Sequence, residues 1–289
     1  MNVIDELKLP ALPEALPRPV TDNHTHFRST REFSGLPAKE SIELAGSVGV
    51  TRFVDVGYDL GSSREAIFLA ESDPRVVAAV ALHPNHAAHV FEQESQEALD
   101  AQLAQLPALA RFDKVRAIGE TGLDHFRTRS EDGRLAQVHS FHAHIEVARE
   151  LDLTLVIHDR EAHQQILDVL DSTTVPERVV MHCFSGDAAF ARECVSRGYW
   201  LSMPGVVTFG SAESLRLAAA EVPLDKLLVE TDAPYLTPKP QRGRPNAPYL
   251  LPHTVRFLAE LLEQDLAALC DQLVSNTFDA FGGPWGQDA

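Results

Sequence analysis

The chain has no apolar run that approaches the roughly 18 residues needed for a membrane-spanning helix. Cysteine is scarce as well: Cys183, Cys194 and Cys270 are odd in number and widely separated along the 289 residues. This spacing offers no Cys-pair zinc motif and is typical of reduced thiols in a cytoplasmic protein. We therefore expect a cytoplasmic protein that does not bind a membrane and is not held together by disulfide bonds.

The N-terminal segment lacks the basic start and apolar centre of a signal peptide. Residues 1–19 are acidic and rich in proline, which predicts a poorly ordered tail or a strap across the bottom of the fold. Residues 20–289 contain no repeat array or low-complexity linker, so we expect them to form a single domain. Their apolar content is sufficient for a large core.

Basic residues are outnumbered, with 25 Lys and Arg against 42 Asp and Glu and a net charge of −17. Such a chain cannot hold long duplex DNA through many phosphate contacts, because that mode of binding needs dense Lys and Arg. The charge still permits a nuclease that holds one strand end, because bound divalent cations would reverse the local sign. No feature indicates an obligate protein partner.

Short apolar, β-branched runs alternate with stretches of helical periodicity. The eight candidate strands are residues 20–22, 52–56, 76–82, 115–119, 154–157, 179–181, 199–202 and 227–230. The candidate helices are residues 39–48, 62–72, 95–105, 137–151, 161–170, 188–197, 212–220, 252–264 and 265–281. Strands separated by helices predict a parallel α/β sheet, and eight such units indicate a (β/α)8 TIM barrel, for which about 250 residues is typical.

Five segments place a histidine or a carboxylate at the C-terminal end of an apolar run or just after it. They are Asp22-Asn23-His24-Thr25-His26, Ile118-Gly119-Glu120-Thr121-Gly122, Val156-Ile157-His158, Met181-His182-Cys183-Phe184-Ser185-Gly186 and Val229-Glu230-Thr231-Asp232. Active sites of these barrels form at the C-terminal face of the strands. The recurrence of the pattern is hard to explain by packing, and it predicts a metal site at that face.

Each histidine also has a structural explanation when it is taken alone. His24 and His26 stand two apart, so both imidazoles could point to one ion, with Asp22 orienting them. With nothing else pointing to a metal, two surface or core histidines would be the better explanation. His158 and His182 could each be a hydrogen-bonded core histidine.

The carboxylates have alternatives of the same kind. Glu120 needs a partner to offset its desolvation, either an arginine such as Arg127 or Arg160, or metal ions that it bridges. Asp232 could be a capping or turn residue before Pro234. Taken together, mixed histidine and carboxylate ligands suit Zn, Mn, Mg or Fe, and two such ions can clamp the attacking and leaving oxygens of a displaced phosphoryl group.

Six motifs occur in order and with compatible spacing between Val20 and Phe281. They are Asp22-Asn23-His24-Thr25-His26, Leu82-His83-Pro84, Gly119-Glu120-Thr121-Gly122-Leu123-Asp124, Ile157-His158, His182-Cys183-Phe184-Ser185-Gly186 and Glu230-Thr231-Asp232-Ala233-Pro234-Tyr235-Leu236. This set resembles the TatD-type metal-dependent hydrolases, which are TIM-barrel members of the amidohydrolase superfamily.

The resemblance implies a site for two divalent ions, Mg, Mn or Zn, and leaves a third ion open. The implied metal ligands are His24, His26, Glu120, His158, His182 and Asp232. Glu120 would bridge the two ions, and Asp232 would be both a ligand and the catalytic proton acceptor. Glu120 and Asp232 are thus the two predicted catalytic residues.

The resemblance also implies residues that bind substrate. His83 matches a histidine that engages the substrate phosphate or a further ion, although it could simply be buried against Pro84. Arg242, Arg244 and Asn246 match the family's basic loop after the last strand. This loop would overhang the mouth of the barrel, or it could be a proline-stiffened surface loop with solvated charges.

Several positions depart from the family's pattern without removing a metal ligand. Asn23 replaces a small hydroxyl residue, Ala81 replaces a glycine, and His125 and Phe126 replace an aromatic pair. Residues 28–36 are longer than the family's tight first loop. These differences leave the shape of the substrate open.

The residues and the resemblance together predict a divalent-metal phosphodiester hydrolase. We expect a deoxyribonuclease that trims single-stranded DNA from 3′ ends in the 3′→5′ direction, using a metal-bound hydroxide. One alternative is a small-molecule amidohydrolase that cleaves an amide or ester on the same metal core. Another is a non-catalytic scaffold with a degenerate site, against which the presence of all six ligand candidates argues.

Overall fold

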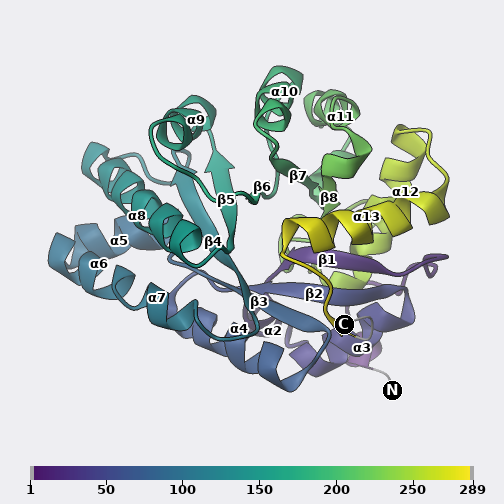
Figure 1. The fold of residues 1–289 in the computed structure, drawn as a ribbon. Coiled ribbons are helices and arrows are strands. Elements are labelled where there is room, and N and C mark those ends of the chain that lie inside the picture. Colours follow the sequence, from purple (N-terminus) through teal and green to yellow (C-terminus); the bar gives the residue numbers. More distant parts are fainter. Residues whose placement is uncertain (1–2, 287–289) are drawn as a thin grey trace.

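The computed structural model describes residues 3–286, in which eight parallel strands pair in chain order. The strands are β1 (Val20–Thr25), β2 (Val50–Val56), β3 (Val76–Val80), β4 (Val115–Asp124), β5 (Thr154–Arg160), β6 (Val179–Met181), β7 (Trp200–Met203) and β8 (Leu227–Val229). Helices lie outside this ring of strands (Figure 1). The predicted TIM barrel is confirmed, and each predicted strand overlaps an observed one.

Backbone hydrogen bonds just beyond β8 join that end of the sheet to β1. The N–H of Asp232 donates to the carbonyl of His24 at 3.0 Å. The N–H of His26 donates to the carbonyl of Ala233, also at 3.0 Å. This closure draws Asp232 against the two histidines at the end of β1.

Every predicted helix overlaps an observed one, and four further α-helices within residues 3–286 were not predicted. The overlapping helices are α3 (Ala38–Ser47), α4 (Leu60–Ser72), α6 (Gln96–Leu103), α8 (Glu131–Glu150), α9 (His163–Asp171), α10 (Ala188–Ser196), α11 (Glu213–Ala220), α12 (Leu251–Leu261) and α13 (Leu266–Ala280). The unpredicted ones are α1 (Val3–Leu7), α2 (Phe27–Ser34), α5 (Pro84–Gln93) and α7 (Leu106–Leu109). Helix α2 occupies most of the segment that the sequence suggested to be a long first loop.

The interior of the barrel is filled by alternate strand residues, as the two-residue period of a strand requires. Val54, Val77 and Val156 belong to one buried cluster with Phe281 and Trp285, which follow helix α13. The C-terminal segment therefore closes the end of the barrel that is opposite to the predicted site.

The described part of the N-terminal segment packs against the barrel's outer helices. Leu9 and Leu16 are buried, and the N–H of Leu16 donates to the carbonyl of Val48, just after α3, at 3.0 Å. The hydroxyl of Tyr249, just before α12, donates to the carbonyl of Pro10 at 2.8 Å. These contacts hold the segment beside α3 and α12.

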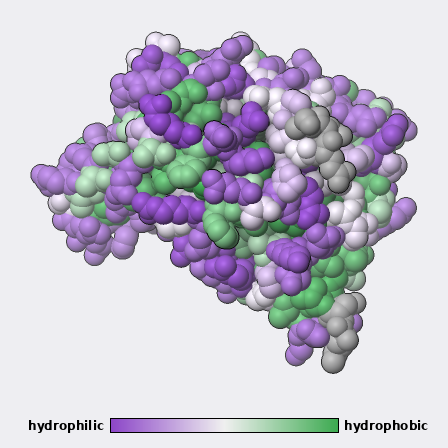
Figure 2. Space-filling model, turned by 60° about the horizontal axis from the view of Figure 1, so that its bottom comes forward, coloured by the Kyte–Doolittle hydropathy of each residue, from purple (hydrophilic) through white to green (hydrophobic). Residues whose placement is uncertain are grey.

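No helix within residues 3–286 is long and apolar enough to cross a bilayer. Figure 2 shows hydrophilic residues over much of the face that it draws, with smaller hydrophobic areas between them. The large hydrophobic side chains that remain exposed include Phe33, Phe68, Phe126 and Tyr235. Three of these four, Phe33, Phe126 and Tyr235, follow the carboxyl ends of strands, on the side of the predicted site.

Candidate metal centre

Six side chains from the carboxyl ends of five strands meet at one mouth of the barrel. They are His24 and His26 from the end of β1, Glu120 from β4, His158 from β5, His182 just after β6 and Asp232 just after β8. Their nitrogen and oxygen atoms form overlapping groups of three, each within 4.8 Å, and one of these groups includes His83. The structure thus brings together all the residues that the sequence suggested as metal ligands.

Glu120 lies at the centre of the cluster, and its two oxygens face different histidines. Oε1 is 3.4 Å from His26 Nε2 and 3.8 Å from His24 Nε2. Oε2 is 2.9 Å from His182 Nε2 and 3.3 Å from His158 Nδ1. No arginine within residues 3–286 forms an ion pair with Glu120, so imidazoles rather than a guanidinium surround this carboxylate. The arrangement suits a carboxylate that bridges two cations.

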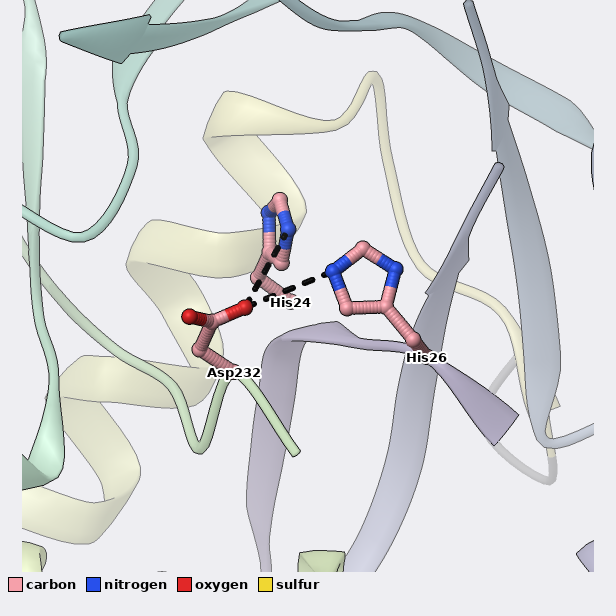
Figure 3. A group of neighbouring side chains, drawn as sticks. All are labelled: His24, His26 and Asp232. Atoms are coloured by element: carbon pink, nitrogen blue, oxygen red, sulfur yellow. Dashed lines mark ion pairs between the residues drawn. The ribbon is translucent and has the colours of Figure 1, made fainter. Parts of the chain in front are cut away.

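Asp232 completes the group on the β1 side. Its Oδ1 is 3.3 Å from His26 Nε2 and 4.0 Å from His24 Nε2. Figure 3 shows both imidazoles directed at this carboxylate oxygen. Asp232 has a φ of 52°, in the left-handed region that aspartate tolerates better than most residues. The unusual backbone conformation occurs where the chain turns from β8 into the site.

Three of the histidines are oriented by hydrogen bonds on the side of the ring away from Glu120. His26 Nδ1 donates to the carbonyl of Val56 at 2.7 Å. His182 Nδ1 lies 3.2 Å from Glu230 Oε1, and His158 Nε2 lies 3.4 Å from Asp124 Oδ2. Histidines that bind metals usually donate their second ring N–H in this way, which fixes the tautomer and leaves the other nitrogen free to ligate.

The hydrogen-bonding state of His24 indicates whether these residues fit a cation. Its side chain is fully buried, yet neither ring nitrogen has a hydrogen-bond partner within residues 3–286. Leaving a buried polar group unpaired costs about 1–3 kcal/mol. A divalent cation held between His24, His26 and Asp232 would give one of these nitrogens a partner. The donor set therefore fits an ion such as Zn, Mn or Mg.

The charged groups of the cluster set one another's protonation. Burial alone would lower the pKa of His182, but the carboxylates of Glu230 and Glu120 raise it to about 10. Burial alone would raise the pKa of Glu120, but the histidines that hydrogen-bond to it, His182 and His158, help to hold it well below its usual value. Protons on imidazoles thus balance the carboxylates until a cation replaces them.

Metal affinity is therefore expected to rise with pH. Because His182 keeps its proton up to a pKa of about 10, an ion that binds its Nε2 must displace that proton at any lower pH. Each displaced proton makes the affinity about tenfold stronger per pH unit. Calorimetric titration with Mn2+ in buffers of different ionisation enthalpy measures both the affinity and the protons released. An affinity that is independent of pH would contradict the assignment of His182.

His83 has a different hydrogen-bonding state from the other histidines. Its Nδ1 accepts the backbone N–H of Asn85 at 3.0 Å, at the start of α5. Burial lowers the pKa of His83 to about 3, so the neutral ring carries its proton on Nε2. An Nε2–H group donates hydrogen bonds and has no lone pair for a cation. Of the two roles considered for His83, this state favours contact with a substrate phosphate.

Gly119 gives Glu120 its position in β4. Gly119 has a φ of 149°, and an added Cβ would overlap the carbonyl oxygen of Val156 and lie 2.6 Å from that residue's Cβ. We expect Gly119→Ala to lower the free energy of unfolding by about 3 kcal/mol through backbone strain and overpacking. Gly198→Ala is the matched control, because Gly198 also has a positive φ but nothing lies within 4 Å of its added Cβ. Equal losses of unfolding free energy for the two variants, measured by urea unfolding, would contradict the close packing of Gly119 against Val156.

A cavity of about 1260 Å³ opens over the cluster, and its lining includes His26, Glu120, His158 and Asp232. Pockets for small ligands typically measure about 300–1,000 Å³. The cavity therefore has room for a substrate larger than a single small molecule.

The basic loop that follows β8 does not contribute its arginines to this cavity in the described part of the chain. Arg242 packs over the ring of Phe209, with 4.3 Å between its guanidinium carbon and the ring centroid. Arg244 donates to a backbone carbonyl of the N-terminal segment at 2.9 Å. The arginines that line the cavity are Arg127 and Arg160. A role for Arg242 and Arg244 in substrate binding stays a prediction.

Two orienting carboxylates received no role from the sequence. Asp124 and Glu230 stand within the motifs quoted above, each close in sequence to a ligand, and a buried carboxylate at such a place could have been recognised as a partner of a histidine. Asp22 was expected to orient imidazoles, but it accepts the backbone N–H of Thr231 at 3.0 Å and also the hydroxyl of Thr231. It therefore anchors the residue that precedes Asp232.

Comparisons with known proteins agree with this geometry. Residues 21–282 match the family of TatD-related DNases. A Mycobacterium tuberculosis protein named as an uncharacterized metal-dependent hydrolase, TatD, is 42% identical over 271 residues, covering 92% of this chain and 99% of that protein. An Erwinia billingiae protein named 3′-5′ ssDNA/RNA exonuclease TatD is 36% identical over 251 residues, covering 84% of this chain and 92% of that protein.

The fold is also shared with solved structures. The crystal structure of a TatD homologue, YJJV, from Escherichia coli K12 superposes with a TM-score of 0.81 at 30% identity, covering 92% of this chain and 98% of that one. An organophosphorus hydrolase from Deinococcus radiodurans shares the fold alone, with a TM-score of 0.60 at 13% identity, over 95% of this chain and 99% of that one. The chain belongs to the TatD-related DNase family of metal-dependent hydrolases.

Proposed function

We propose that the protein is a phosphodiesterase with two divalent ions, and specifically a deoxyribonuclease that removes nucleotides from the 3′ end of single-stranded DNA. The observation that carries the proposal is the position of Glu120, whose two oxygens face different pairs of histidines. The family's description as DNases and the name of the Erwinia billingiae relative support the choice of substrate.

Two ions at this site would lower the pKa of a water molecule and stabilise charge on the phosphate during its displacement. Glu120 would hold both ions at a fixed separation. His24, His26 and Asp232 would complete one site, and His158 and His182 would complete the other.

The remaining steps belong to side chains that line the cavity. Asp232 reaches the cavity with 13% of its side chain exposed, and it would accept the proton released when water attacks phosphorus. His83 would donate its Nε2–H to an oxygen of the phosphate. Because Asp124 accepts from His158, it would keep the ring of His158 in the orientation that the site needs.

The test is digestion of single-stranded DNA labelled at the 5′ or the 3′ end, with Mg2+, Mn2+ or Zn2+. We expect 5′-labelled DNA to shorten in a ladder, and 3′-labelled DNA to release labelled mononucleotide at once. Failure to cleave nucleic acid with any of these ions, together with hydrolysis of an amide or ester, would make the protein a small-molecule amidohydrolase. Absence of any metal affinity would instead indicate a scaffold.

A further inference from the structure

The two sides of the mouth differ in chemistry. Helix α2, which follows β1, presents Phe33 to the cavity, and β5 ends in Arg160, which also lines it. In a ring of eight strands that pair in chain order, β1 and β5 lie opposite each other. The metal-ligand cluster lies between them, because β1 carries His24 and β5 carries His158.

The Phe33 side offers an aromatic surface, and the charged residues Arg28 and Glu32 beside it are paired with each other. Phe33 is 65% exposed, although it lines a cavity. Glu32 lines the cavity beside it, and its only recorded ion pair within residues 3–286 joins it to Arg28 at 2.9 Å. Because Arg28 is paired with Glu32, its charge is already offset and attracts a phosphate little, whereas a nucleobase could stack on the ring of Phe33.

The Arg160 side offers a positive charge that no carboxylate neutralises within residues 3–286. The guanidinium carbon of Arg160 lies 4.1 Å from the centroid of the Phe126 ring. A guanidinium held over a ring keeps its N–H donors at the edge, where they can bind a phosphate. Arg127 lines the cavity on the same side and adds a second charge. These two arginines are a local exception in a chain with a net charge of −17.

We infer that Phe33 and Arg160 hold the substrate strand across the mouth: Phe33 stacks on a nucleobase on one side of the cleaved bond, and Arg160 binds a backbone phosphate on the other. This inference rests on the proposed nucleic-acid substrate. It assigns recognition of the strand to α2 and to the end of β5, where the sequence alone suggested the loop that follows β8.

The first test measures binding of fluorescein-labelled, phosphorothioate-linked oligothymidylate, which resists cleavage, to the metal-loaded protein. Phe33→Ala is expected to weaken binding about tenfold, the usual effect of removing one stacked ring. Phe68→Ala is the matched control, because Phe68 is 73% exposed on α4 and does not line the cavity. When the terminal residues of the oligonucleotide are abasic, they have no base to stack on Phe33. Phe33→Ala should then leave the affinity for the oligonucleotide unchanged. Equal affinities of the Phe33→Ala and Phe68→Ala variants for the oligonucleotide would overturn the assignment of Phe33 as a stacking residue.

The second test uses the salt dependence of the same binding reaction. Loss of one phosphate contact reduces the slope of log affinity against log salt concentration by about 0.7 for a single strand. We expect this reduction for Arg160→Gln and no change for Arg149→Gln, whose exposed arginine lies in the last turn of α8. An unchanged slope in Arg160→Gln would overturn the phosphate assignment.

Hydrolysis of methyl 4-nitrophenyl phosphate by the unaltered protein distinguishes a failure of the proposed strand contacts from a failure of the proposed function. This small phosphodiester has neither a base nor a second phosphate. If the protein hydrolyses it with metal but both binding tests fail, then the strand contacts are wrong and the phosphodiesterase proposal survives. If the protein hydrolyses neither this compound nor DNA, the proposed function itself fails.

Discussion

Glu120→Gln is expected to lower metal-dependent phosphodiester hydrolysis by at least about a thousandfold. The substitution keeps the shape of the side chain and removes the charge that faces both groups of histidines. An amide also places an NH2 group where one oxygen stood, so it cannot ligate two ions with two oxygens. The loss should therefore include the affinity for both ions, which metal analysis after dialysis measures together with the rate.

The control for Glu120→Gln is Glu94→Gln, because Glu94 is an exposed carboxylate just after helix α5. This control should keep both its metal content and its rate. Circular dichroism should show a folded barrel in both variants, because the hydrophobic clusters do not depend on Glu120. Wild-type rate and metal content in Glu120→Gln would contradict the bridging role.

Asp232→Asn is expected to lower the rate by about a hundredfold to ten-thousandfold, the range for loss of a general base. In contrast to Glu120, Asp232 faces only the histidines at the end of β1. This variant should therefore bind one ion more weakly and keep its affinity for the ion between His158 and His182. Titration of the metal-free variant with metal should show one strong and one weakened site. This result would distinguish Asp232, which holds one ion, from Glu120, which holds both.

The matched control is Asp225→Asn, whose exposed carboxylate lies just before β8 and outside the cavity. It should behave as the unaltered protein does. Full nuclease activity of Asp232→Asn in the presence of chelator would contradict a metal-dependent mechanism altogether.

The sequence predicted the barrel because its strands are buried on both faces and therefore read as continuous apolar runs. Helix α2 was not predicted for a physical reason. Its N-cap residue, His26, makes no side-chain capping bond, and its first turn contains no acidic residue. The start of helix α5 could have been recognised in the sequence, because Pro84 occupies its first turn. The structure adds that the side chain of His83 accepts the N–H of Asn85.

The metal cluster could be anticipated because strand ends converge in a parallel barrel, whatever the exact strand lengths. The substrate side could not be anticipated in the same way. The direction of Arg244 depends on a hydrogen bond to the N-terminal segment, more than 200 residues away in sequence. The position of Arg160 depends on its contact with Phe126 across the ends of β4 and β5. Such contacts are set by tertiary packing and leave no local pattern.

The central claim is that two ions held by one bridging carboxylate carry out phosphodiester hydrolysis. Stepwise addition of Mn2+ to metal-free protein, with hydrolysis of methyl 4-nitrophenyl phosphate followed at each step, tests it most directly. We expect activity to appear as the second equivalent of Mn2+ binds, and Glu120→Gln to show no such rise. Full activity with one ion per chain, or in the presence of chelator, would contradict it.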